Sequence, residues 1–136
     1  MRKLAALLLL LTFPAHAANI QSSDYAATGG TGNALLTNSA VQVGPVGQRN
    51  LTGIFASNPN NATVYLQLFN GTAASVVLGT SVPQAVIPVG STAPLEVALP
   101  DTSAITFTNG LSIAATTTPT GTSAPATGIT ATIGFQ

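Results

Sequence analysis

Residues 63–69 read Thr-Val-Tyr-Leu-Gln-Leu-Phe, and the even-numbered positions of this stretch are all aliphatic. Successive side chains of an extended chain point to opposite faces, so a second face carries Tyr65, Gln67 and Phe69. A helix would need apolar residues recurring about every 3.6 positions, and no window of the chain sustains that period. The stretch therefore predicts a β-strand with one face in a hydrophobic core.

The same alternation recurs along the chain between turn residues such as glycine, proline and asparagine. Asn109-Gly110 lies between two alternating segments and predicts a β-hairpin, because Asn-Gly favours the positive φ of tight hairpin turns. About eight short strands predict an all-β fold, a single antiparallel β-sandwich of jelly-roll type, with a closed barrel as the alternative. The further strands predicted in this way cover residues 34–43, 51–56, 75–78, 84–89, 95–99, 105–108, 111–116 and 129–135.

The chain begins with the features of an export signal. Two basic residues, Arg2 and Lys3, precede an apolar run over residues 4–11, and Ala15-His16-Ala17 matches the small-residue pattern of a cleavage site. The apolar run is much shorter than the roughly 20 residues that span a bilayer. We therefore predict a cleaved signal peptide and an exported protein that is periplasmic, extracellular or on the cell surface, with no membrane insertion of the mature chain.

The predicted organisation follows from this processing and from the strand pattern. Residues 1–17 form the signal peptide, and residues 18–32 form a flexible N-terminal arm that is polar and contains several glycines. Residues 33–136 form the β-sandwich domain. The arm is also a candidate for adding a strand to a neighbouring sheet.

The charged side chains after Ala17 are few: Asp24, Arg49, Glu96 and Asp101. Only 4% of the whole chain is charged, there is no cysteine, and the single histidine lies within the signal peptide. Catalysis by Ser or Thr needs a base, zinc and copper sites need His or Cys, and nucleic-acid binding needs basic residues. We therefore predict a protein that is not an enzyme and that has no metal, no cofactor and no nucleic-acid partner.

Three residues are candidate assembly contacts. Tyr65 and Phe69 share the face opposite the aliphatic one, where they offer aromatic area to a partner. Arg49 either contacts a neighbouring subunit or is a solvated charge at the start of a strand. Residues 116–126 are rich in Thr, Pro and Ala and predict a long surface loop, which is a candidate for binding glycans or a protein.

Five stretches within residues 57–122 carry a further signal. They are Ala-Thr-Val-Tyr-Leu-Gln-Leu-Phe-Asn (62–70), Leu-Gly-Thr-Ser-Val-Pro (78–83), Ile-Pro-Val (87–89), Gly-Leu-Ser-Ile-Ala-Ala-Thr-Thr-Thr (110–118) and Thr-Gly-Thr (120–122). With these stretches, residues 57–122 resemble small, uncharacterised β-sandwich proteins of tailed phages and prophages. This resemblance covers about half of the chain, its motifs are structural, and it implies a non-enzymatic role on a particle, such as capsid decoration. The chain departs from the pattern by its added signal peptide.

These observations together predict an exported, non-enzymatic structural protein. It would self-associate as a homo-oligomer or decorate a larger assembly, which is a virion-like particle, a filament or a cell surface. The alternative function is a secreted binding module that recognises surface glycans or a protein through its loops.

Overall fold

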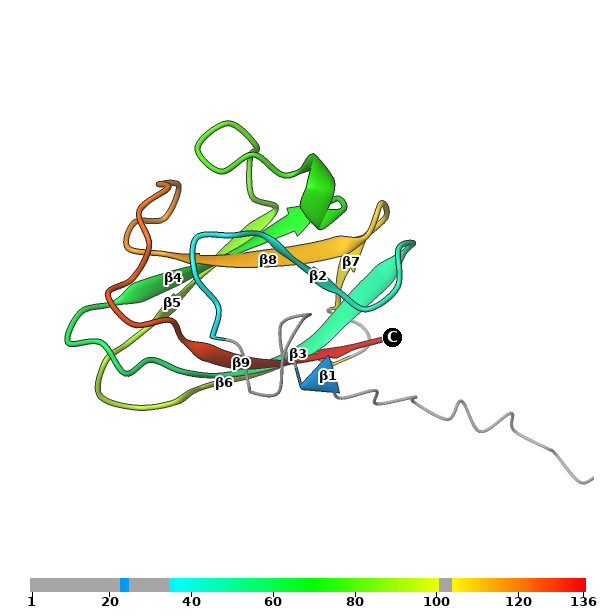
Figure 1. The fold of residues 1–136 in the computed structure, drawn as a ribbon. Helices are drawn as coiled ribbons and strands as arrows, with labels where there is room; N and C mark the ends of the chain where they lie inside the picture. Colours follow the sequence, from blue (N-terminus) through cyan, green and yellow to red (C-terminus); the bar gives the residue numbers. More distant parts are fainter. Residues whose placement is uncertain (1–22, 25–34, 101–103) are drawn as a thin grey trace, which may run out of the picture.

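The computed structural model describes residues 23–24, 35–100 and 104–136, and almost all regular structure in them is β (Figure 1). The prediction of an all-β fold is confirmed. One 3₁₀ turn, η1, covers Ala73–Ser75. The strands are β1 (Ser23–Asp24), β2 (Val41–Val43), β3 (Arg49–Ser57), β4 (Val64–Asn70), β5 (Ala85–Val89), β6 (Leu95–Ala98), β7 (Ile105–Phe107), β8 (Leu111–Thr116) and β9 (Thr130–Phe135).

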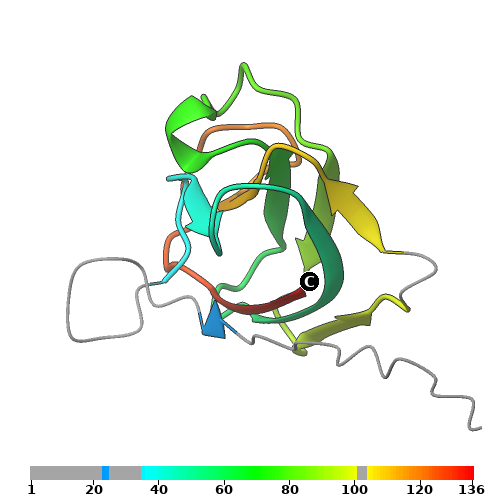
Figure 2. The same cartoon turned by 90° about the vertical axis from the view of Figure 1, so that its right-hand side faces the viewer.

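The strands form two antiparallel sheets that lie face to face (Figures 1 and 2). One sheet has the order β1-β9-β3-β6, with β7 also paired to β3, and the other has the order β2-β8-β4-β5. Strands β6 and β7 pair with successive parts of β3, so together they occupy one strand position in the sheet. With these two strands counted together, the orders are those of a jelly roll, which confirms the predicted β-sandwich.

The core lies between the sheets and takes alternate residues of the strands, with one break in this alternation in β3. The aliphatic face of β4 is fully inside, and β9 contributes its odd-numbered residues. This alternation is the reason that the pattern in residues 63–69 predicted the strand correctly. The buried core residues are Leu36, Val43, Leu51, Ile54, Ala56, Val64, Leu66, Leu68, Val89, Phe107, Leu111, Ile113, Ala115, Ile129, Ile133 and Phe135.

The outer faces of the two sheets differ. All six residues of β8 are buried, because the loops over residues 71–84 and 117–126 lie above the outer face of β4 and β8 (Figure 1). One link of this cover is the Ser112 hydroxyl, which donates to the Gly71 carbonyl oxygen at 3.0 Å. The outer face of the other sheet instead carries exposed residues, among them Phe55 and Glu96. The sandwich therefore has one covered face and one open face.

The strand predicted over residues 75–78 is wrong. The chain forms η1 there and then a turn, and Val77 is exposed. Two hydroxyls satisfy the local backbone: Ser75 Oγ donates to the Thr72 carbonyl oxygen at 2.8 Å, and Val77 N donates to Ser81 Oγ at 2.9 Å. Such local bonds compete with a β-ladder, and the edge of β4 that faces away from β8 is already paired with β5.

The hairpin predicted at Asn109-Gly110 is also wrong, although a tight turn is present. The strands on its two sides belong to different sheets, since β7 pairs with β3 whereas β8 pairs with β2 and β4. Gly110 has a φ of 111°, and its carbonyl oxygen accepts from Gly71 N at 2.9 Å. Asn109 N donates to Asn70 Oδ1 at 2.8 Å. The turn is a corner between the sheets and is held by Asn70 and Gly71.

Several predicted features lie outside the described residues. These include the signal peptide over residues 1–17, most of the arm over residues 18–32, and Asp101. Of the arm, the structure describes Ser23–Asp24, which pairs with β9 as β1. In the parts of the chain that are described, no helix is long and apolar enough to cross a membrane.

Candidate functional site

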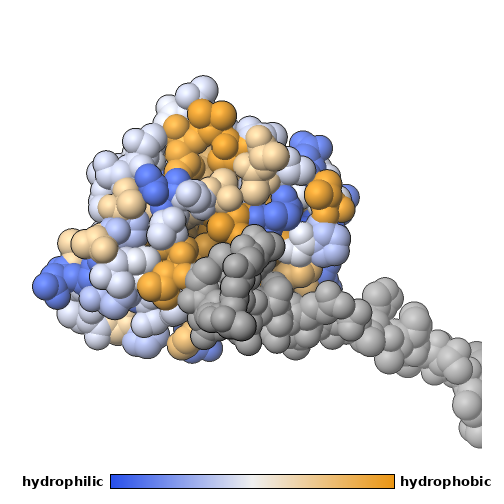
Figure 3. Space-filling model, viewed as in Figure 1, coloured by the Kyte–Doolittle hydropathy of each residue, from blue (hydrophilic) through white to orange (hydrophobic). Residues whose placement is uncertain are grey.

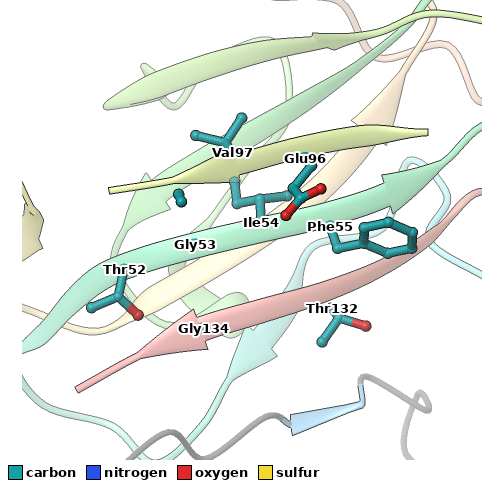
Figure 4. A pocket seen from close by; sticks show the side chains of 9 residues that line it. Thr52, Gly53, Ile54, Phe55, Glu96, Val97, Thr132 and Gly134 are labelled. Atoms are coloured by element: carbon teal, nitrogen blue, oxygen red, sulfur yellow. The ribbon is translucent and has the colours of Figure 1, made fainter. Parts of the chain in front are cut away.

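The open face is formed by the outward side chains of β6, β3 and β9, and Phe55 lies at its centre. Phe55 is opposite Glu96 of β6 on one side and Thr132 of β9 on the other. Directly opposite residues have Cβ atoms about 4.5–5.5 Å apart, so the three side chains form one row across the sheet. Figure 4 shows the Phe55 ring and the Glu96 carboxylate on this row. Phe55 is 50% exposed, which is unusual for a phenylalanine in a central strand.

The neighbouring row has almost no side chains. Gly53 lies opposite Ala98 of β6 and Gly134 of β9, so one methyl group is the only side-chain material across three strands. A Cβ at Gly53 would lie 3.2 Å from the Val97 carbonyl oxygen, and a Cβ at Gly134 would lie 3.0 Å from Thr52 Oγ1. The result is a hollow of about 240 Å³ beside the Phe55 ring, lined by residues of these strands (Figure 4).

A β-bulge sets which side chains reach this face. The pairing of β3 with β9 shifts between Leu51 and Gly53, so Thr52 is an extra residue on β3. Leu51 and Ile54 are both buried although they are three residues apart, and Phe55 then points outward. The Thr52 carbonyl oxygen accepts from Leu99 N at 2.8 Å, which ties the bulge to the end of β6.

The lining of the hollow has few ionisable groups. Its lining has a single ionisable group, Glu96, and the hydroxyls of Thr52 and Thr132 have no His or Lys beside them. In the described part of the chain, no three residues of the His, Cys, Asp and Glu types lie together as a metal site would require. An exposed aromatic ring beside a flat, shallow hollow is a surface that another molecule can cover.

The structure corrects the expectation for Phe69. Its side chain is 2% exposed, so it has no area to offer a partner in this fold, whereas Tyr65 is partly buried. The face that these residues share is the covered face of the sandwich, beneath the chain's own loops. Between them, Gln67 is 1% exposed and binds the loop that follows β8. The aromatic face of β4 is therefore already covered within one copy.

The loop over residues 116–126 is anchored to the sheet below it. The Gln67 side-chain amide donates to Thr116 Oγ1 at 2.7 Å and to the Gly121 carbonyl oxygen at 3.1 Å. Asn38 Nδ2 donates to the Thr122 carbonyl oxygen at 2.8 Å, and Pro125 is buried. Residues 117–120 are exposed, and Thr117, Thr118 and Thr120 carry hydroxyls. Recognition of glycans by this loop stays a prediction.

Arg49 lies at the start of β3 and packs against the end of the core. Its guanidinium carbon is 5.7 Å from the centroid of the Phe135 ring, and Nη1 donates to the Gln48 carbonyl oxygen at 2.6 Å. Its Nε is buried without a hydrogen-bond partner. Arg49 is thus partly buried over an aromatic ring within its own chain.

Comparisons of the chain with models of protein families, with curated proteins and with solved structures found no match. The resemblance of residues 57–122 to small β-sandwich proteins of tailed phages stays a prediction. The sequence pattern also missed the open face, since Leu51 and Phe55 are four residues apart and this even spacing places both on one side of an unbroken strand. Glycine at positions 53 and 134 was the available signal, because glycine within a strand often marks a bulge or a close approach.

Proposed function

We propose that the protein is an exported, non-enzymatic structural module whose copies associate with one another through the open face of β6, β3 and β9. The predicted signal peptide supports the export. A jelly roll alone does not choose a function, since this architecture occurs in both capsid and lectin domains. The choice therefore rests on the surface that the domain presents.

The observation that carries the proposal is the half-exposed Phe55 ring beside the hollow that Gly53 and Gly134 line. A projecting ring and a hollow on the same face are complementary to each other. A twofold axis near them would place the ring of each copy in the hollow of the other, as an isologous interface requires. Such packing would remove Phe55 from water, where an exposed aromatic ring is least favourable.

The small number of charged side chains supports the same proposal of self-association. The charged side chains described in the structure are Arg49 and Glu96, and Arg49 lies over Phe135 rather than on the open face. Two such surfaces repel each other weakly, and burying them desolvates few charges.

Other exposed apolar residues, such as Val77 and Val82, lie in the loop between β4 and β5, where Figure 3 shows a hydrophobic patch.

The size of the open face makes each contact weak. Three strands about 4.8 Å apart, over about five residues of 3.3 Å each, cover roughly 250 Å². A standard stable interface buries about 800 Å² per partner. One open face alone therefore gives a weak contact, and further contacts between copies must contribute to a lasting assembly.

The test is the substitution Phe55→Thr, which retains a residue that favours strands but removes the ring. Fully burying a phenylalanine contributes about 1.5–3 kcal/mol; each ring is 50% exposed and two rings are buried per pair of copies, so the dissociation constant should rise roughly 10- to 100-fold. The measurement is sedimentation velocity over a range of concentrations. Val46→Thr is the matched control, because Val46 is exposed in the turn between β2 and β3, away from the open face, and this variant should associate normally. Equal association of the wild type and Phe55→Thr would contradict the proposal, as would a wild-type monomer at every concentration.

A further inference from the structure

The edge of β9 that faces away from β3 is paired at two separate places. Gln136 and Asn50 exchange backbone hydrogen bonds of 2.8 and 3.0 Å on the β3 side, and backbone groups alternate in direction along a strand. The odd-numbered residues of β9 therefore direct their backbone groups to the opposite edge. On that edge, Leu36 exchanges bonds of 2.8 and 3.0 Å with Ile129, and Ser23 pairs with Ile133.

Two segments of the chain, β1 and the residues around Leu36, pair with this edge of β9. The stretch of chain that joins them is much longer than the distance between their two pairing positions. Asp24 lies opposite Thr132 and Leu36 lies opposite Ile129, both antiparallel to β9. The two positions are three residues apart on β9, which is roughly 10 Å. About eleven residues join Asp24 to Leu36, and an extended chain of that length reaches roughly 36 Å. The same connection can therefore reach the corresponding edge of a second copy.

The short pairing of β1 makes it the easiest strand to release. It matches two residues of β9, whereas β3 matches six residues of β9 and β4 matches six residues of β8. The strand order assigns β1 the place of the first strand of a jelly roll, so the fold needs a strand at this edge. An unpaired edge presents free backbone groups, which any extended segment of suitable register can satisfy.

We propose that β1 is exchanged between copies, so that Ser23–Asp24 of one copy pairs with β9 of another in the register Ser23↔Ile133 and Asp24↔Thr132. This inference rests on the proposed self-association and identifies the second contact that the small open face requires. Backbone pairing supplies the exchanged contact, and the register places it beside Thr132, at the margin of the open face. Reciprocal exchange gives a closed dimer, and exchange in one direction gives a chain of copies.

The absence of cysteine allows a specific test by disulfide trapping. Asp24 and Thr132 are opposite each other, and Thr132 directs its backbone groups toward β3, so they form a non-hydrogen-bonded pair with Cα atoms about 4.5 Å apart. That separation is within the range of disulfides. Full-length Asp24→Cys and Thr132→Cys proteins, each with a different tag, are expressed with export, purified, mixed under reducing conditions and then oxidised.

Exchange predicts a disulfide-linked product that carries both tags and has roughly twice the chain mass on a non-reducing gel. Its yield should rise with total concentration. The control mixture pairs Asp24→Cys with Thr120→Cys, an exposed loop position, and should give only background cross-linking. A second variant carries Asp24→Cys and Thr132→Cys in one chain, and exchange predicts covalent dimers or longer products.

Two negative outcomes separate the proposals. If the wild type associates but the two-cysteine chain gives only an internal disulfide, and the mixture gives no more product than the control, β1 exchange is overturned and self-association stands. If the wild type is a monomer at every concentration, both proposals fail.

Discussion

At the scale of single residues, Thr52 has the largest effect on the open face. Without the bulge at Thr52, Leu51 and Phe55 would share one side of β3 and the ring would enter the core. The extra residue reverses the direction of the following side chains, so Ile54 and Ala56 are buried and Phe55 is exposed. The single extra residue, Thr52, therefore places the Phe55 ring on the surface instead of in the core.

Gln67 is the residue that holds the covered face together. Its amide lies under the loop after β8 and donates to Thr116 Oγ1 and to the Gly121 carbonyl oxygen. The Thr116 hydroxyl in turn donates to the Thr118 carbonyl oxygen at 2.7 Å. The Thr116 hydroxyl is buried and the two carbonyl oxygens are partly buried, so these acceptors have lost water contacts and depend on their donors.

We expect Gln67→Met to lower the free energy of unfolding by about 1–3 kcal/mol, because it removes the donor to the buried Thr116 Oγ1 and to the partly buried Gly121 carbonyl oxygen while keeping a similar volume. Urea denaturation followed by circular dichroism measures the change. Gln84→Met is the matched control, since the Gln84 amide donates to the Thr106 carbonyl oxygen at an exposed site, and it should change stability by less than about 0.5 kcal/mol. Equal losses for the two variants would show that the loop does not depend on Gln67.

At the scale of elements, the corner at Asn109-Gly110 connects the two sheets. Strand β7 ends beside β3, and β8 begins in the other sheet between β2 and β4. The reversal uses a positive φ at Gly110, which other residues adopt with strain. The local sequence predicts the tight turn, and the sheet that each flanking strand joins depends on distant partners.

Gly110→Ala should lower the free energy of unfolding by about 1–3 kcal/mol, because alanine is strained in the left-handed region. The added Cβ would also lie 3.3 Å from Gln42 Nε2. Thermal unfolding monitored by calorimetry provides the measurement. Gly90→Ala is the comparison, since no atom lies within 4 Å of the position of its Cβ and no positive φ is recorded there. A Gly110→Ala protein as stable as Gly90→Ala would contradict a strained corner.

At the scale of the whole molecule, the proposed self-association depends on the low charge and on the difference between the two outer faces. One outer face is covered by the chain's own loops, and the other presents Phe55, the hollow and, among the side chains that the structure describes, one carboxylate, Glu96. Association through such a surface depends on burial and backbone pairing more than on long-range attraction.

This surface predicts self-association that is nearly independent of salt. Raising sodium chloride from about 50 to about 300 mM shortens the electrostatic screening length about 2.4-fold, yet the dissociation constant should change less than about threefold. Sedimentation equilibrium at both concentrations tests this. Arg49→Gln should respond in the same way, because Arg49 lies over its own Phe135. A tenfold weakening in high salt would instead indicate that ion pairs hold the copies together.

The sequence alone determined the fold class and most of the strands, because alternating burial is a local pattern with a period of two residues. It also limited the chemistry, since a chain without cysteine and with its only histidine near the start has few reactive groups. The tertiary structure alone decided that Phe69 is covered, that Phe55 is exposed, and that Asn109-Gly110 is a corner. Each of these outcomes depends on residues far apart in the sequence: the loop above Gln67, the bulge opposite β9, and the separate partners of β7 and β8. Local periodicity can say that a side chain alternates, but only the packed sheets decide what covers it.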